Sequence, residues 1–226
     1  MRFLVLFLSS ITFAQFHFDE PIKYLALGDS YTIGTSVTEN QRWSTQLYDS
    51  LGRLGNDLED IRFIARVGWT TSSLSDAMQQ QDIDSDYNLV SLLIGVNNQY
   101  QSVPFGLYEE EFPQLVQDAL VLLNGDVNSL FVVSIPDYAF TPFGAGLESI
   151  SSELDVYNLF AKAYCDSIGV KFFNITEISR DNTPIMVALD GLHPSAYQYS
   201  LWVDEILRSY SEDDVLNITK IDDVPA

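Results

Sequence analysis

Five short apolar runs recur along this chain, and each is too short for an ordinary helix. They cover residues 22–27, 61–67, 89–94, 130–136 and 170–175. The runs at 22–27 and 89–94 are almost continuously apolar, which is typical of parallel strands covered on both faces. The run at 61–67 alternates apolar and polar residues for part of its length, as a strand nearer a sheet edge does. We therefore predict five β-strands.

The segments between these runs carry apolar residues at the three- and four-residue spacing of one helix face. They cover residues 41–54, 70–81, 104–123, 148–168 and 194–210. Strands and helices therefore alternate, which predicts an α/β fold with a parallel sheet, helices on both faces and right-handed crossovers. No linker divides residues 16–210, which we predict to form one domain, followed by a loose acidic tail at 211–226.

The N-terminal segment 1–15 has the pattern of a secretory signal peptide. A basic start, Met1-Arg2, precedes an apolar stretch, and cleavage is expected near Ala14 or Gln15. The stretch is well below the ~20 apolar residues that a membrane-spanning helix needs. We therefore expect a secreted or periplasmic protein without stable membrane insertion. The alternative for this segment is an N-terminal strand.

The chain is strongly acidic, because 32 Asp and Glu against 11 Lys and Arg give a formal net charge of −21. Such a surface repels nucleic acid and anionic lipid, so we exclude a nucleic-acid-binding role and favour a neutral substrate. The 226 residues, 46% of them hydrophobic, suffice for a buried core without a disulfide or metal. The single cysteine, Cys165, lies in a helical pattern and excludes both an internal disulfide and a cysteine-rich zinc site. The sequence leaves the oligomeric state open.

Four patches of small, polar and hydroxyl residues lie at the ends of predicted elements. They are 28–30 (Gly-Asp-Ser), 67–71 (Val-Gly-Trp-Thr-Thr), 95–98 (Gly-Val-Asn-Asn) and 190–194 (Asp-Gly-Leu-His-Pro). Ligands bind at the carboxyl ends of the strands in open α/β sheets, so patches at successive strand ends should share one crevice. Taken singly, Ser30, Gly68 and Asn97 would be ordinary turn residues. Their occurrence together favours a functional site.

Ser30 is the candidate nucleophile of this site. A serine hydroxyl is a poor nucleophile near neutral pH and needs a base within hydrogen-bond reach, usually a histidine. Of the two histidines, His17 lies just past the expected cleavage point, which leaves His193. Asp190, three residues earlier in a turn that contains Gly191, can accept the Nδ1 proton and leave Nε2 free for Ser30. Standing alone, His193 would be an ordinary loop or capping residue.

Together and in this order, the four patches resemble the signature blocks of the SGNH (GDSL-type) hydrolase family across nearly the whole chain. The G-x-S-x-G elbow of α/β-hydrolases is not met, since Thr32 stands where the second glycine belongs. The resemblance implies a three-layer α/β/α sandwich whose five parallel strands have a flavodoxin-like order. It also implies an oxyanion hole formed by the backbone N–H groups of Ser30 and Gly68 and by the Asn97 side chain.

Two positions depart from the family pattern. Tyr31 stands where the GDSL name has leucine, a position that varies widely. Asn98 replaces the usual aspartate of the third block and so removes a charge beside the oxyanion donor. Asparagine nevertheless keeps most of the hydrogen-bond acceptance of an aspartate.

We predict hydrolysis of a small-molecule or glycan carboxylic ester through an acyl-enzyme, without a metal or organic cofactor. The family spans lipid, thio-, aryl and acetylated-sugar esters, and fold-level analogy does not choose among them. Trp69, Tyr100 and Phe140 are candidate substrate contacts, and the aromatic loop at 137–147 either lines a pocket or packs on the core. Two alternatives are a flavin or phosphate binder with its loop at 30–35, and a catalytically silent SGNH-like domain that binds a glycan.

Overall fold

The computed structural model describes residues 18–221, so the expected signal peptide lies outside the described residues. Five strands form one parallel sheet. They are β1 (Ile22–Gly28), β2 (Leu58–Ala65), β3 (Leu89–Leu93), β4 (Leu130–Val133) and β5 (Lys171–Phe173). The strand order is β2-β1-β3-β4-β5 and each neighbouring pair is parallel. This confirms the flavodoxin-like order.

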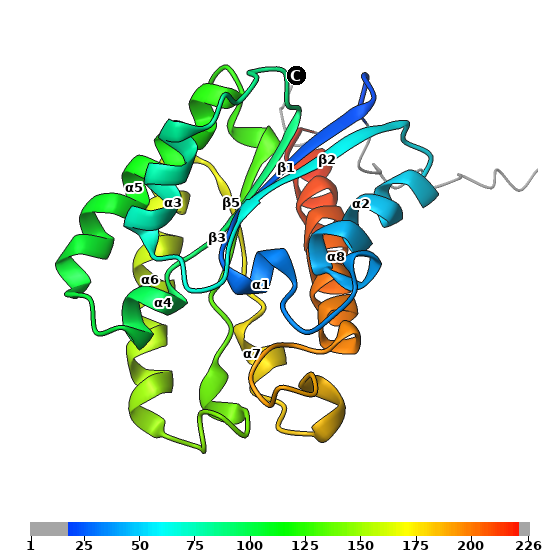
Figure 1. The fold of residues 1–226 in the computed structure, drawn as a ribbon. Coiled ribbons are helices and arrows are strands. Elements are labelled where there is room, and N and C mark those ends of the chain that lie inside the picture. The colour runs from blue at the N-terminus through cyan, green and yellow to red at the C-terminus, as the bar shows by residue number, and fades with distance from the viewer. Residues whose placement is uncertain (1–17, 222–226) are drawn as a thin grey trace, which may run out of the picture.

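Helices cover both faces of the sheet, which confirms the three-layer architecture (Figure 1). One face carries α2 (Trp43–Arg53) and α8 (Ala196–Ile221). The other carries α3 (Thr71–Gln80), α5 (Phe105–Leu122) and α6 (Glu148–Ile168). Three short helices, α1 (Ser30–Ile33), α4 (Val96–Tyr100) and α7 (Thr176–Ser179), follow β1, β3 and β5 at the carboxyl edge of the sheet.

The centre of the sheet is rigid because its strands are buried on both faces. Every residue of β3 is buried, and so is every residue of β1 except Lys23. Trp43 and Trp202 are fully buried from the α2 and α8 layer, and Tyr108 is buried from α5. An aromatic side chain of this size removes about 150–250 Å² from water, worth roughly 4–6 kcal/mol. The strand ends are therefore well suited to position side chains.

Two glycines bring short helices directly onto the ends of the central strands. A Cβ at Gly28 would lie 2.2 Å from Thr32 Oγ1 and 2.4 Å from the Leu93 carbonyl oxygen. A Cβ at Gly95, whose φ is +126°, would lie 2.6 Å from a ring carbon of Tyr108. Only glycine allows these close approaches, so α1 and α4 begin at once beyond β1 and β3.

Several boundaries differ from the sequence predictions. The strand expected at 61–67 is β2, which begins earlier, at Leu58, because pairing with β1 from Ile22↔Leu58 onward holds its exposed start. The segment between the first predicted strand and the helix predicted at 41–54, for which no element was expected, begins with helix α1. Helix α8 continues beyond residue 210 to Ile221, since no glycine or proline interrupts it, so 211–221 is helical and not a loose tail. The rest of the expected tail, 222–226, lies outside the described residues.

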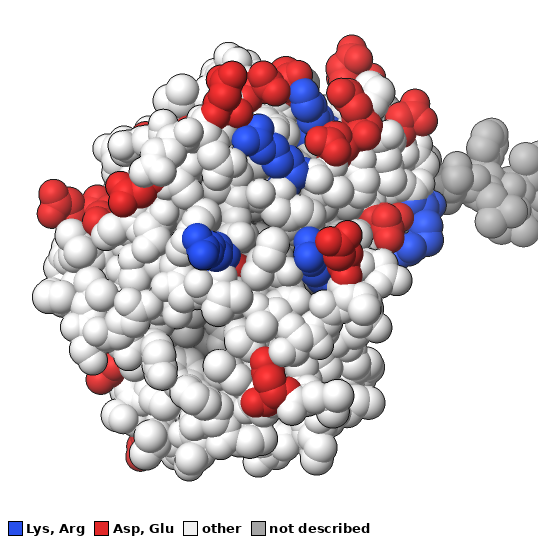
Figure 2. Space-filling view, in the orientation of Figure 1, with Lys and Arg blue, Asp and Glu red and all other residues white. Residues whose placement is uncertain are grey.

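No helix within residues 18–221 combines the length and the apolar character that crossing a membrane requires. Charged side chains gather along the upper edge of the face in Figure 2. The lower half of that face, around the carboxyl ends of the strands, is mostly uncharged.

Candidate active site

Ser30 is the first residue of α1 and is almost completely buried. The preceding Asp29 caps this helix, and its Oδ1 accepts a hydrogen bond from the Tyr31 N–H at 2.9 Å. Gly34 ends the helix in the left-handed conformation, and its N–H donates to the Ser30 carbonyl oxygen. Burial raises the pKa of Asp29 to about 7, more than the hydrogen bond from Tyr31 lowers it. The turn that carries Ser30 is thus fixed at both ends.

Asp190 and His193 form a hydrogen-bonded pair in the turn before α8. His193 Nδ1 lies 2.6 Å from Asp190 Oδ2, and the N–H groups of Leu192 and His193 donate to Asp190 Oδ1 at 3.0 Å. Partial burial raises the pKa of Asp190, but hydrogen bonds from Ser36, Leu192 and His193 outweigh it and hold that pKa well below its usual range. The carboxylate is therefore ionised at neutral pH and able to orient the imidazole.

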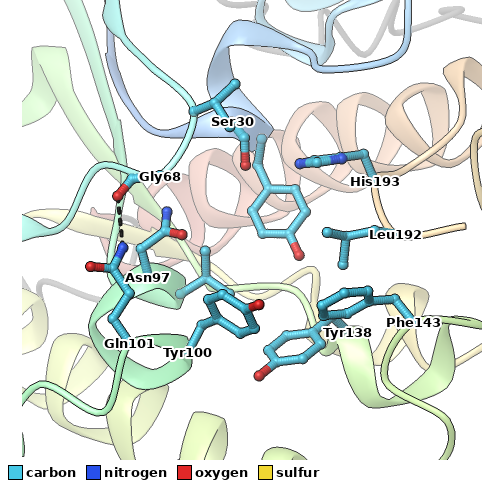
Figure 3. Close-up of a pocket in the computed structure, with 12 residues that line it drawn as sticks. Ser30, Gly68, Asn97, Tyr100, Gln101, Tyr138, Phe143, Leu192 and His193 are labelled. Carbon is cyan, nitrogen blue, oxygen red and sulfur yellow. Dashed lines mark hydrogen bonds between the residues drawn. The ribbon is translucent and has the colours of Figure 1, made fainter. Parts of the chain in front are cut away.

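Ser30 and His193 both line one cavity. Figure 3 shows a ring nitrogen of His193 facing the Ser30 hydroxyl, with no hydrogen bond drawn between them. Because Nδ1 is engaged by Asp190, the nitrogen that faces Ser30 is Nε2. Contacts of this kind often tighten only when a substrate binds.

Gly68 and Asn97, the expected oxyanion donors, line the same cavity. Asn97 Nδ2 donates to the Trp69 carbonyl oxygen at 3.0 Å, and Gln101 Nε2 donates to the Gly68 carbonyl oxygen at 2.9 Å. Side chains from α4 and the residue after it therefore hold the backbone of the 68–71 loop. The Asn97 amide has two hydrogens, and its contact with Trp69 uses one, which leaves the other for a ligand oxygen.

Asn98, which replaces the expected aspartate, anchors the same loop. It is fully buried, its Oδ1 accepts from the Thr71 N–H at 3.0 Å, and its Nδ2 donates to Thr71 Oγ1 at 2.6 Å. Thr71 Oγ1 in turn donates to Glu111 of α5. The asparagine keeps the loop attached to α3 and α4 without a charge at this position.

The cavity has a volume of about 280 Å³. Its lining includes His193 and three tyrosines but no Asp, Glu, Lys or Arg. Tyr100, Tyr138 and Phe143 form its wall on the side away from Ser30 (Figure 3). Their ring centroids are 6.3, 5.8 and 6.2 Å apart, at edge-on or tilted angles. The Tyr138 hydroxyl donates to Gln99, which donates to Glu153 of α6. These two hydrogen bonds connect the aromatic wall to α6.

The three residues predicted to contact the substrate, Trp69, Tyr100 and Phe140, do not lie in the same place in the structure. Tyr100 lines the cavity and is 55% exposed, whereas Phe140 lies outside this lining and borders a second cavity together with Arg180. Trp69 packs against the core, and its carbonyl oxygen, not its ring, contacts Asn97. The expectation for Phe140 and Trp69 is not met, because the sequence does not show which side of a loop a side chain occupies.

Two contacts at the candidate site had no signal in the sequence. Ser36 donates to Asp190 across 154 residues, and Gln101 reaches the Gly68 carbonyl oxygen. Both residues are polar and lie in loops, so that only the tertiary fold reveals their partners. Among the residues in the described range 18–221, no cluster of three or more His, Cys, Asp and Glu side chains is arranged to hold a metal ion.

A parallel sheet with a serine at the end of its first strand, opposite a histidine paired with an aspartate, defines a serine hydrolase of the α/β/α class. The family model of the GDSL-like lipase/acylhydrolase family matches residues 26–201, and the chain belongs to this family. It is an esterase of the SGNH type, and no finding favours the flavin-binding or catalytically silent alternatives.

Solved structures of similar fold accompany this match. A lipase/acylhydrolase from Enterococcus faecalis is 14% identical, with a TM-score of 0.67 over 85% of this chain and 96% of that chain. The corresponding values for TesA are 16%, 0.65, 81% and 94%. Those for Axe2, an acetyl xylan esterase from Geobacillus stearothermophilus, are 18%, 0.62, 82% and 92%. These structures share the fold, and a search of curated proteins gave no match.

Proposed function

We propose that this protein hydrolyses short-chain carboxylic esters through a covalent intermediate on Ser30. The observation that carries the proposal is the position of His193, which is bonded to Asp190 through Nδ1 and faces the Ser30 hydroxyl through Nε2. Ser30 and His193 line a cavity of about 280 Å³ that suits an uncharged substrate.

In the first half of the reaction, Ser30 Oγ attacks the ester carbonyl carbon while His193 Nε2 accepts the hydroxyl proton. Asp190 stabilises the imidazolium that forms, because its ionised carboxylate accepts from Nδ1. His193 then returns the proton to the leaving alcohol oxygen. The products of this half are the free alcohol and an acyl group bonded to Ser30.

Negative charge develops on the carbonyl oxygen during the attack. The proposed donors are the N–H groups of Ser30 and Gly68 and the second Nδ2 hydrogen of Asn97. The contacts of Asn97 and Gln101 with the 68–71 loop support this role, since they fix the loop before the substrate arrives. Donors that are already oriented stabilise the transition state without reorganisation.

In the second half, His193 removes a proton from water, and the resulting hydroxide equivalent attacks the acyl carbon. Collapse of this second tetrahedral intermediate breaks the bond to Ser30 Oγ, which takes back the proton from His193. The carboxylic acid leaves and the enzyme returns to its starting state.

The acyl group is expected to be short because the cavity is small and is bounded on the side away from Ser30 by Tyr100, Tyr138 and Phe143. The volume of about 280 Å³ lies just below the roughly 300–1,000 Å³ that pockets for small-molecule ligands occupy. The Tyr138 hydroxyl donates to Gln99, and Gln99 donates to Glu153, so the position of the Tyr138 ring is restrained. We expect acetyl to butyryl groups to be accepted and a palmitoyl chain to be excluded.

An acetylated carbohydrate is the second candidate substrate. Tyr100 is 55% exposed at the cavity and presents a ring on which a sugar can stack. The likeness to the acetyl xylan esterase Axe2 supports an acetyl ester as substrate.

A panel of p-nitrophenyl esters from acetate to palmitate, measured beside acetylated xylan, tests the proposal. We expect kcat/KM to be highest between acetate and butyrate and to fall from octanoate onward. Ser30→Ala and His193→Ala should each remove most activity, and together they should cost little more than either alone. Ser167→Ala, at an exposed serine near the end of α6, is the matched control and should leave the rate unchanged. A preference for palmitate would refute the acyl-length assignment, and activity in Ser30→Ala would refute the mechanism.

We also propose that the protein is exported. The basic and apolar pattern of residues 1–15 supports secretion or transfer to a periplasm. N-terminal sequencing of protein recovered from the exported fraction should find cleavage near Ala14 or Gln15. An uncleaved N-terminus in the cytoplasmic fraction would contradict it.

A further inference from the structure

Asp190 also accepts a hydrogen bond from a residue outside its own turn. The Ser36 hydroxyl donates to Asp190 Oδ2 at 2.6 Å, and the same oxygen lies 2.6 Å from His193 Nδ1. The other oxygen accepts the N–H groups of Leu192 and His193. The carboxylate is therefore held at both oxygens, and Ser36 makes the contact that comes from another part of the chain.

The backbone at Ser36 supports a specific use of this hydroxyl. Ser36 has a φ of 68°, in the left-handed region that is unfavourable for a residue with a Cβ. The residue is exposed, so packing does not explain why a serine and not a glycine occupies this position. Backbone conformations of this kind cost free energy and occur more often at functional sites than elsewhere. The contact that the structure shows for this side chain is the hydrogen bond from its hydroxyl to Asp190.

We propose that Ser36 is a positioning residue of the active site, whose hydroxyl holds the Asp190 carboxylate against His193. It also links the loop that follows the nucleophile helix α1 to the turn that carries the base. The inference rests on the proposed function, because it assigns Ser36 a part in the proton transfer between Ser30 and His193.

Two effects should follow when the hydroxyl is removed. The carboxylate loses one of the contacts that fix its rotation, so the imidazole is oriented less well and kcat falls. Without the Ser36 hydroxyl, Asp190 Oδ2 accepts a hydrogen bond from His193 alone. Its negative charge then stabilises the imidazolium more strongly. The acidic limb of the pH–rate profile should therefore move to higher pH.

Other titratable groups also face this pair, from three elements packed against it. The Tyr31 ring lies edge-on to the His193 ring, with centroids 5.7 Å apart, and the buried Asp29 precedes it. Tyr138 comes from the aromatic wall, and Tyr199 comes from α8, where its hydroxyl donates to the Tyr31 carbonyl oxygen. All of these groups remain in the variants below, so they do not account for a difference between them.

The test compares three variants of the full chain. Ser36→Gly removes the hydroxyl and relieves the backbone strain, whereas Ser36→Ala removes the hydroxyl and keeps the strain. Asn124→Gly is the matched control, because Asn124 has a φ of 53° in the connection from α5 to β4, at the opposite edge of the sheet. If the backbone conformation at position 36 alone mattered, Ser36→Ala, which keeps that conformation, would behave like the wild type.

We expect both Ser36 variants to lower kcat/KM on p-nitrophenyl acetate roughly tenfold and to move the acidic limb upward, while Asn124→Gly changes neither. A limb that stays in place in both Ser36 variants, or a wild-type rate, would overturn the inference. Proton NMR supplies a readout without turnover, since the low-field resonance of the His193–Asp190 proton should shift in the Ser36 variants even in a Ser30→Ala background. Activity that survives Ser30→Ala would overturn the proposed function instead, and an unshifted resonance would overturn the role of Ser36.

Discussion

Replacing Asn98 by aspartate, the residue usual in the family, is expected to destabilise this protein. Asn98 Nδ2 donates to Thr71 Oγ1 at 2.6 Å, and Thr71 Oγ1 gives its only proton to Glu111 Oε2 at 2.5 Å. An aspartate at position 98 would place the Thr71 hydroxyl between two carboxylates with one proton to donate. One carboxylate oxygen would then lose its donor in a buried position.

The expected magnitude follows from these distances. Two hydrogen bonds of 2.6 and 2.5 Å through one hydroxyl oxygen keep the nearest atoms of positions 98 and 111 within about 5.1 Å. Two like charges at that separation repel by about 3 kcal/mol at an effective dielectric constant of 20. Partial exposure of Glu111 screens this repulsion, while the lost hydrogen bond adds about 1 kcal/mol. We therefore expect Asn98→Asp to lower the free energy of unfolding by roughly 2–4 kcal/mol.

Urea unfolding of four proteins measures this effect, with Asn98→Asp and Glu111→Gln made singly and together. The glutamine can donate to Thr71 Oγ1, which frees the Thr71 proton for the carboxylate introduced at position 98, so the double variant should recover most of the loss. Asn40→Asp adds the same charge at an exposed position and should change stability by less than about 0.5 kcal/mol. An Asn98→Asp protein as stable as the wild type, or no recovery with Glu111→Gln, would refute the reasoning.

Three further predictions concern the site. Asn97→Ala should lower kcat by roughly 10²–10³-fold through loss of one oxyanion donor, and an unchanged kcat in steady-state assays would remove Asn97 from that role. Phe143→Ala should open the aromatic wall and raise kcat/KM for octanoate relative to acetate at least about tenfold, which an unaltered chain-length profile would contradict. The raised pKa of Asp29, about 7, makes its contribution to stability fully present below about pH 4 and progressively lost as pH rises to 7. Asp29→Asn should therefore gain up to roughly 4 kcal/mol relative to the wild type between pH 4 and 8 in urea unfolding, and parallel pH profiles would contradict this.

The arrangement of strands and long helices could be predicted because burial leaves a direct pattern. Strands covered on both faces, such as β1 and β3, are almost uniformly apolar, and long helices repeat their apolar residues at helical spacing. The single-turn helix α1 could not be predicted, since four residues show no periodicity and the cap at Asp29 and the turn at Gly34 define it. The exposed start of β2 likewise depends on pairing with β1 and not on hydropathy.

The candidate site was predictable to the extent that its residues follow strand ends or lie close in sequence. Asp190 and His193 are three residues apart, so their pairing follows from a local turn. The contact of Ser36 with Asp190 depends on the whole fold and leaves no local signal. The aromatic loop illustrates the same limit, because Tyr138 and Phe143 face the cavity while Phe140 faces the other side.

Covalent trapping tests the central claim, that Ser30 is a nucleophile activated by His193, most directly. The protein is incubated with a fluorophosphonate probe, and the labelled peptide is located by mass spectrometry. We expect one adduct, on Ser30, with labelling greatly slowed in His193→Ala and unchanged in Ser167→Ala. An adduct on another residue, or equal labelling of the wild type and His193→Ala, would contradict the claim.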